Sequence, residues 1–152
     1  MNDAAPPDRR RAEAPSTGGV TQAADNDIAR RTDSYFNRTK AIVQRFGDCR
    51  VTYAVFLRRP VISAHRLATD WLQSVAAARG TAFGIEVMHE EGAWVGAGDP
   101  IFYVSGSFAH LVDLETVMLQ KLGAACVAAH NAYQMCVELP GVPFLAMEAR
   151  HC

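Results

Sequence analysis

The segment from Ile85 to Gly106, IEVMHEEGAWVGAGDPIFYVSG, constrains the fold of this chain more than any other. Its apolar residues fall into short runs separated by glycines, a pattern typical of short strands joined by tight turns. Glycine supplies the positive φ angles that such turns need, and Asp99 followed by Pro100 indicates a loop that closes before a new strand. The segment therefore predicts a compact, barrel-like β sandwich.

A β unit of this kind can carry a lipoyl or biotinyl group on a lysine at the tip of a hairpin. The only lysines of the chain, Lys40 and Lys121, lie outside the segment. We therefore interpret the segment as a scaffold and look for function in the residues that flank it.

Composition excludes several classes of protein. A chain of 152 residues with 49% hydrophobic composition suits one domain with a buried core. A net charge of −1 gives no field that attracts nucleic acid, and no apolar run approaches the roughly 18 residues that cross a membrane. The four cysteines lack C-x-x-C spacing and no hydrophobic signal sequence is present, so we expect reduced thiols in the cytoplasm.

Residues 1–27 are predicted to be a disordered tail, because they contain almost no large apolar residue to offset their ordering entropy. Regular order is predicted to begin at Thr32. There, Thr32 or Asp33 caps a helix whose apolar positions follow helical spacing, and Gly47 ends it.

Five further elements flank or follow the glycine-rich segment. They are a strand over Arg50–Leu57, a helix capped by Ser63 and closed by Gly80, a helix with an apolar stripe over Leu111–Leu122, a helix over Ala124–Val137, and a buried strand over Pro143–Glu148. No element follows the last strand to cover it, so we expect the chain to break off inside a larger fold.

Two pairs of residues are candidates for binding. Asp33 and Tyr35 lie at the predicted start of a helix, where the tyrosine ring can project as a stacking platform, although capping alone explains the acid. Arg150 and His151 follow a predicted buried strand, the position at which α/β sheets place their ligands. The guanidinium fork of Arg150 would suit a planar carboxylate or a phosphate; a solvated chain end is the alternative.

Other polar residues are given structural interpretations. Cys126 and His130 have the spacing of two metal ligands on one helix face, but no second pair exists, so core packing is favoured and no metal site is expected. Glu115, beside the apolar stripe, is interpreted as a buried acid paired with an arginine. The sequence contains no Walker loop, serine triad or zinc signature.

Four stretches, in this order, resemble the amino-terminal third to half of a nicotinate phosphoribosyltransferase: TDSYFNRT from Thr32, EGAWVGAGDPIFYVSGSF from Glu91, LETVMLQKLG from Leu114, and the final MEARHC. The resemblance implies an α+β fold, with a hammerhead-like α/β sandwich and the start of a type II phosphoribosyltransferase α/β barrel, truncated here. It places the sandwich and its bridging helices in residues 28–138 and the incomplete barrel in residues 139–152.

By that resemblance, the full-length enzyme makes nicotinate mononucleotide and pyrophosphate from nicotinate and phosphoribosyl pyrophosphate, coupled to ATP hydrolysis and assisted by Mg²⁺, in NAD salvage. Tyr35 resembles the tyrosine that stacks on the pyridine ring across a homodimer interface, and Asp33 the acid beside it. Arg150 resembles the arginine that binds the nicotinate carboxylate or the substrate phosphate, with His151 adjacent. Since most of the barrel is missing, we expect this chain alone to show no detectable synthesis.

Two alternatives stay open: a quinolinate or nicotinamide phosphoribosyltransferase relative, and a non-catalytic sandwich module that binds a partner. The enzyme hypothesis predicts an exposed apolar face around Leu114, Met118, Phe144 and Leu145. The module hypothesis predicts a stable monomer whose last strand is covered by its own chain.

Overall fold

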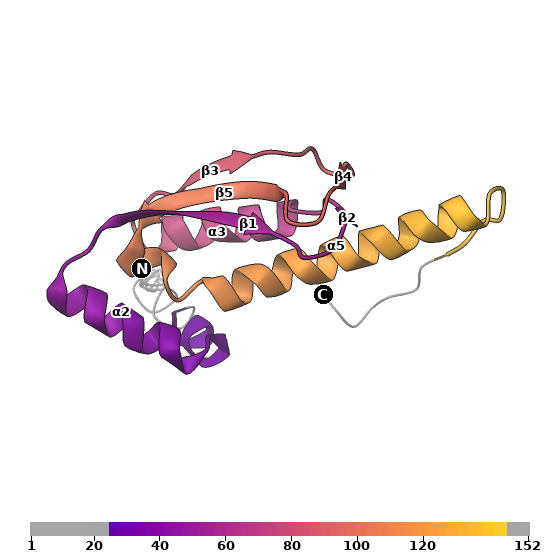
Figure 1. Ribbon diagram of the computed structural model, residues 1–152. Coiled ribbons are helices and arrows are strands. Elements are labelled where there is room, and N and C mark those ends of the chain that lie inside the picture. The colour runs from indigo at the N-terminus through magenta and orange to yellow at the C-terminus, as the bar shows by residue number, and fades with distance from the viewer. Residues whose placement is uncertain (1–24, 146–152) are drawn as a thin grey trace, which may run out of the picture.

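Segments rich in β-branched, aromatic and glycine residues form the sheets of the computed structural model, which describes residues 25–145 (Figure 1). The three-stranded antiparallel sheet contains β1 (Arg50–Phe56), β5 (Pro100–Ser107) and β3 (Gly84–Val87), in that order. The two-stranded antiparallel sheet contains β2 (Val61–Ile62) and β4 (Trp94–Val95). The predicted strand that begins at Arg50 and the strands of the glycine-rich segment are thus confirmed.

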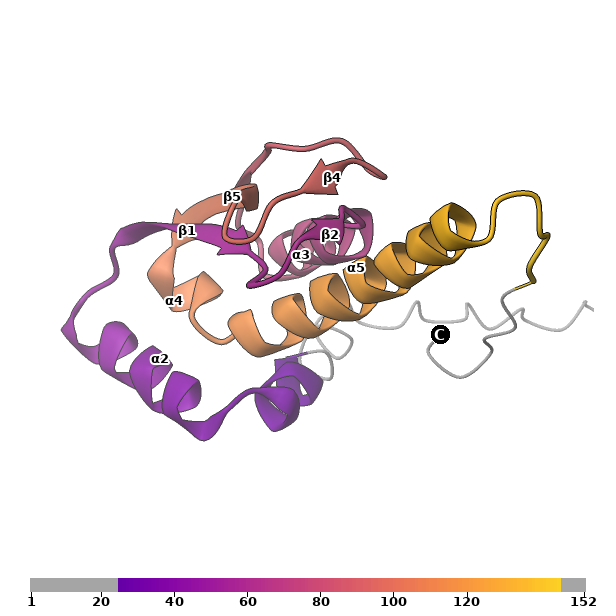
Figure 2. The same ribbon diagram turned by 45° about the vertical axis from the view of Figure 1, so that its right-hand side comes forward.

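The three-stranded sheet is covered on one face only. Along β1, Val51, Tyr53 and Val55 pack toward the core, and the residues that alternate with them are exposed. Figures 1 and 2 show the long helices beneath this covered face. Within residues 25–145 the sheet does not close on itself, so the barrel-like arrangement expected from the sequence is corrected to an open sandwich.

Four labelled helices, α2 (Ser34–Phe46), α3 (Arg66–Ala78), α4 (Phe108–Leu111) and α5 (Glu115–Glu138), and a helical segment at residues 25–31 complete the described fold. The apolar stripes of α3 and α5 form the core against β5. Leu72 of α3, Leu122 of α5 and Phe102 of β5 are all 0% exposed. By contrast, α2 buries a single residue, Val43, so packing alone holds this helix weakly.

Order begins earlier in the chain than the sequence predicts. Residues 25–31 are helical, and Ile28 in this helix belongs to the hydrophobic core. The expectation that order starts at Thr32 is therefore wrong, because one buried isoleucine and a polar contact of Asp25 anchor the preceding turn. Residues 1–24, most of the predicted tail, lie outside the described residues.

The start of α3 also differs from the prediction. Ser63 does not cap this helix. It directly follows β2 and is 1% exposed, and α3 begins three residues later, at Arg66. The Glu91 carboxylate accepts hydrogen bonds from the backbone N–H groups of His65 and Arg66 and so replaces the expected serine cap. The predicted end is confirmed, since Gly80 follows the helix with φ of +62°.

The two helices predicted over Leu111–Leu122 and Ala124–Val137 are instead one continuous helix, α5, preceded by the short α4. Gly123 lies inside α5, and an isolated glycine costs a helix only about 1 kcal/mol. Pro140, the first proline after the helix, follows its end at Glu138. The local composition around Gly123 therefore predicted two helices, but the backbone is helical through this residue.

The two halves of α5 differ in burial. All its buried residues, Val117, Met118, Leu122 and Cys126, lie in the first half. The second half projects beyond the sandwich in Figures 1 and 2, and its apolar side chains are exposed. The predicted exposed face is wrong for Leu114 and Met118, which are core residues at 1% and 2% exposure. It is confirmed for Phe144 and Leu145, which are exposed.

The predicted strand over Pro143–Glu148 is not confirmed. Residues 143–145 are neither helix nor strand, and residues 146–152 lie outside the described part of the chain. Among the helices of residues 25–145, none is long and apolar enough to cross a membrane.

Candidate functional site

Two of the four predicted site residues lie together at the start of α2. Asp33 occupies the N-cap position of this helix, but its carboxylate makes no capping bond. Instead, one carboxylate oxygen lies 3.5 Å from the Thr116 hydroxyl of α5. The Tyr35 ring is 56% exposed and lies against the Phe36 ring, with 4.1 Å between ring centroids. Arg150 and His151 lie outside the described residues.

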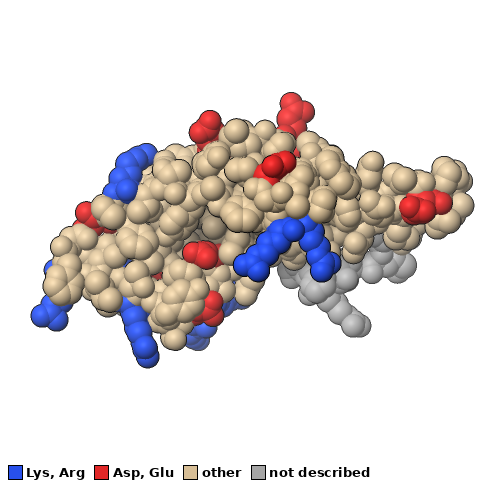
Figure 3. Space-filling model, in the orientation of Figure 1, with Lys and Arg blue, Asp and Glu red and all other residues tan. Residues whose placement is uncertain are grey.

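The start of α2 faces the start of α5 across a hollow of about 380 Å³. Asp33, Tyr35 and Glu115 line this α2–α5 hollow. A second hollow of about 490 Å³ lies between β1 and α5 and shares Glu115 as a lining residue; Tyr53 and Arg58 also line it. On the face seen in Figure 3, acidic and basic side chains are interspersed.

Glu115 is the acid that the two hollows share. Partial burial, and then the nearby charge of Asp33, raise the pKa of Glu115 above its ordinary value. Desolvation, and then the charges of Asp33 and Glu115, raise the pKa of Tyr35. Burial, followed by the charge of Glu115, raises the pKa of Tyr53 to about 12. Both tyrosines therefore stay neutral near pH 7 and present uncharged rings.

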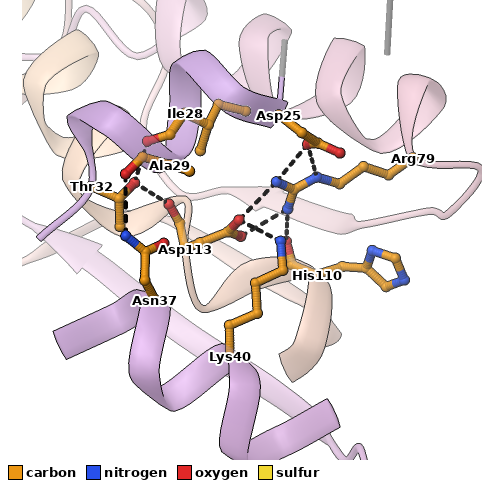
Figure 4. Close-up of polar contacts among 9 residues, drawn as sticks. All are labelled: Asp25, Ile28, Ala29, Thr32, Asn37, Lys40, Arg79, His110 and Asp113. Carbon is orange, nitrogen blue, oxygen red and sulfur yellow. Dashed lines mark hydrogen bonds and ion pairs between the residues drawn. The ribbon is translucent and has the colours of Figure 1, made fainter. Parts of the chain in front are cut away.

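The expected pairing of Glu115 with an arginine is wrong, because within residues 25–145 no ion pair involves this acid. The buried acid that pairs with an arginine is Asp113, which is 2% exposed (Figure 4). Its two carboxylate oxygens accept hydrogen bonds from Arg79, both at 2.8 Å, and one also accepts from Lys40 at 2.6 Å. Burial alone would raise the pKa of Asp113, but the bonds from Arg79 and Lys40 lower it below its ordinary value.

Sequence reasoning missed Asp113 and its partners. A single acid within the otherwise apolar stretch LVDL, Leu111–Leu114, was the available signal, since such an acid needs a buried partner. The partners come from other elements: Arg79 follows α3, and Lys40 lies in α2. Arg79 also binds Asp25, with 2.8 Å between a guanidinium nitrogen and a carboxylate oxygen.

A contact among Ser63, His65 and Glu91 resembles a catalytic triad only in composition. The Ser63 hydroxyl lies 3.0 Å from Nδ1 of His65, and the Glu91 carboxylate lies 3.2 Å from the same nitrogen. A triad needs the acid and the nucleophile on opposite ring nitrogens. Ser63 is also buried, so this cluster fixes the start of α3 and does not form a nucleophile site.

Core packing at Cys126 is confirmed. The Cys126 sulfur accepts a hydrogen bond from the backbone N–H of Ala64 at 3.3 Å, and burial raises the pKa of its thiol. Four residues further along α5, His130 lies beside the Trp94 ring, with 5.5 Å between centroids. Residues 25–145 contain no group of three histidine, cysteine, aspartate or glutamate side chains that could hold a metal ion.

No protein-family model matches the sequence, and no curated protein matches it. Solved structures do. A structure titled nicotinate-nucleotide pyrophosphorylase from Pyrococcus furiosus is 19% identical, with a TM-score of 0.59 over 85% of this chain. A NadC deletion mutant, solved in two crystal forms, gives TM-scores of 0.58 at 20% and 18% identity, over 82% and 81% of this chain. These neighbours are nicotinate-nucleotide pyrophosphorylases.

At such identities the likeness shows the fold alone: the described residues fold as a part of each of these neighbours' chains does. The chain spans only 32% of the Pyrococcus furiosus chain and 42% and 41% of the two NadC chains. The neighbours are not nicotinate phosphoribosyltransferases, the family that the sequence motifs resemble. What the neighbours share with this chain is therefore the fold of one part of their chains.

Proposed function

We propose that this chain supplies the sandwich part of a phosphoribosyltransferase that acts on a pyridine carboxylate in NAD biosynthesis. The observation that carries the proposal is the fold likeness to nicotinate-nucleotide pyrophosphorylases over 85% of the chain. The sequence motifs, which lie in the same order as in nicotinate phosphoribosyltransferases, support the same class of reaction. In that reaction the pyridine nitrogen forms a bond to the anomeric carbon of phosphoribosyl pyrophosphate as the bond from that carbon to pyrophosphate breaks.

In this proposal the α2–α5 hollow is one wall of the pyridine site. Its exposed aromatic ring, Tyr35, offers a face on which a planar pyridine can stack. Stacking holds the ring in line with the anomeric carbon, which matters because an electron-poor ring is a weak nucleophile. The neutral state of the Tyr35 phenol near pH 7 avoids repulsion of an anionic substrate.

The same hollow is poorly suited to bind the substrate carboxylate. Asp33 and Glu115 line it, and among residues 25–145 no lysine or arginine does. A carboxylate group would therefore point away from this wall, toward a cation elsewhere. Arg150, with His151 beside it, is our candidate for that cation, on the resemblance alone.

Quinolinate transfer is the first candidate, because the structural neighbours are nicotinate-nucleotide pyrophosphorylases. Nicotinate transfer is the second, because the stretches TDSYFNRT and MEARHC resemble that family. ATP coupling, Mg²⁺ and a homodimer belong to the second candidate.

The test is a substrate panel assayed with the whole gene product that carries this sequence. The protein is incubated with phosphoribosyl pyrophosphate, Mg²⁺ and quinolinate, nicotinate or nicotinamide, with and without ATP, and the pyridine mononucleotide is quantified by chromatography. We expect product with quinolinate, independent of ATP. Product from nicotinate that depends on ATP would favour the second candidate, and no mononucleotide from any of the three would contradict the proposal.

A further inference from the structure

Helix α2, whose start carries the proposed substrate-binding residues Asp33 and Tyr35, has two short polar contacts with one acid, Asp113. The Lys40 amine of α2 lies 2.6 Å from the Asp113 carboxylate. Just before α2, the Thr32 hydroxyl lies 2.7 Å from the backbone carbonyl oxygen of Asp113. Figure 4 shows both contacts converging on this residue, which precedes α5. Lys40 and Thr32 therefore bracket Asp33 and Tyr35 along the chain.

These contacts matter because α2 buries little apolar surface, and the other contact at its start, between Asp33 and Thr116, is longer at 3.5 Å. Val43 is the only buried residue of this helix. Tyr35 and Phe46, two of its three aromatic side chains, are exposed at 56% and 78%. A helix with so small an apolar contact takes its position from the polar contacts that it makes with the core.

Arg79, the other partner of Asp113, makes it possible to remove the Lys40 contact and change the position of α2 without a large loss of protein stability. Arg79 binds both carboxylate oxygens of Asp113 at 2.8 Å, with its own side chain 4% exposed. The charge of Asp113 therefore keeps a buried counter-ion if the Lys40 amine is removed. The Lys40 side chain is 26% exposed, so it is the partly exposed member of the cluster. When its amine is removed, the buried charges of Asp113 and Arg79 still pair with each other.

We infer that Asp113 is a positioning residue: through Lys40 and Thr32 it sets where Asp33 and Tyr35 stand relative to Glu115 across the α2–α5 hollow. This inference rests on the proposed function, since it is the pyridine ring that the placement of Tyr35 would serve. The two hydrogen bonds from Arg79 fix the Asp113 carboxylate against the core, and the contact between Lys40 and this carboxylate fixes α2 relative to it.

The test compares Lys40→Met with the wild type in the whole gene product. The methionine keeps an apolar stem and removes the amine. We expect the KM for the pyridine acid to rise by roughly tenfold, because a ring wall displaced by a fraction of an ångström loses stacking contact. The kcat and the KM for phosphoribosyl pyrophosphate should change by less than about twofold, and Lys40→Arg, which restores a donor, should recover most of the loss.

Two further measurements separate placement from stability. Hydrogen exchange of the backbone amides of residues 34–39 should be faster in Lys40→Met than in the wild type, with the thermal midpoint nearly unchanged. Arg31→Met is the matched control, because it removes an exposed pair of the preceding helix, Arg31 with Asp27. It should change neither the KM nor the exchange.

The outcomes distinguish this inference from the proposed function. A wild-type protein that makes no pyridine mononucleotide overturns the proposed function, and the inference with it. An active wild type whose Lys40→Met variant keeps the wild-type KM and the wild-type exchange of residues 34–39 overturns the inference and leaves the proposed function standing. A raised KM for both substrates together with a lowered thermal midpoint also overturns it, because that pattern indicates general destabilisation.

Discussion

At the scale of single residues, Asp113 joins three segments that are far apart in the sequence, through contacts with Thr32, Lys40 and Arg79. It is a buried carboxylate with two cationic partners, Arg79 and Lys40, drawn from different elements. A buried ion pair is not in itself a large source of stability, because both charges lose their hydration. Removing one partner is costly, however, because the other charge is then buried and uncompensated.

Asp113→Asn should therefore lower the free energy of unfolding by about 3 kcal/mol, as the breaking of a buried pair does. Urea denaturation monitored by circular dichroism measures this change. Asp27→Asn, in the exposed pair with Arg31, is the control and should cost about 0.5 kcal/mol or less. Equal losses in the two variants would contradict the assignment of Asp113 as the buried anchor.

The pH dependence of Asp113 has a definite sign. Its folded pKa lies below the ordinary value of 3.8, so its charge stabilises the folded state above pH 3.8. That contribution is lost as the pH falls from 3.8 through the lower folded pKa. The difference in unfolding free energy between wild type and Asp113→Asn should be constant near neutral pH and shrink in this acid window. A difference that grew there instead would show that the folded pKa is raised.

At the scale of elements, Gly106 of β5 and Gly123 of α5 differ in whether the structure has room for a side chain. A Cβ atom added to Gly106 of β5 would lie 2.7 Å from the Phe83 ring, closer than carbon atoms pack. A Cβ atom added to Gly123 inside α5 would meet nothing within 4 Å. Gly106 is therefore needed for close packing against Phe83. The described residues show no packing reason for a glycine at position 123.

Gly106→Ala should destabilise the fold by about 1–3 kcal/mol, because the Phe83 ring must move. Gly123→Ala should stabilise it by up to about 1 kcal/mol, since alanine is the better helix former and has room. Differential scanning calorimetry of the two variants gives both signs. Stabilisation by Gly106→Ala would refute the close contact with Phe83.

The sequence predicts elements better than it predicts their contacts. Local periodicity and capping suffice for α2 and β1, because both signals lie within the element itself. The continuity of α5 was missed, because Gly123 and the change to an alanine-rich composition favoured a break and the second half carries no buried apolar stripe. The Arg79–Asp113 fork could not be read, because it joins residues 34 positions apart that only the tertiary fold brings together.

At the scale of the whole molecule, the described residues form an open sandwich with the fold of part of a nicotinate-nucleotide pyrophosphorylase. The α2–α5 hollow and the hollow between β1 and α5 share Glu115, and the exposed ring of Tyr35 lines the first of them. The sequence placed Asp33 and Tyr35 at the start of a helix but gave no sign that α5 would face them, because that neighbour lies about 80 residues along the chain. The site prediction for Arg150 and His151 stays a prediction.

The central claim is that Tyr35 is a wall of the pyridine site, and one comparison of variants tests it most directly. The KM for the pyridine acid is measured in the whole gene product for Tyr35→Phe and Tyr35→Ala, beside the KM for phosphoribosyl pyrophosphate. Loss of a stacked ring costs about 1–3 kcal/mol, so Tyr35→Ala should raise the first KM by roughly tenfold or more, whereas Tyr35→Phe should stay close to the wild type. The KM for phosphoribosyl pyrophosphate should not change in either variant. A Tyr35→Ala protein with the wild-type KM for the pyridine acid would contradict the account.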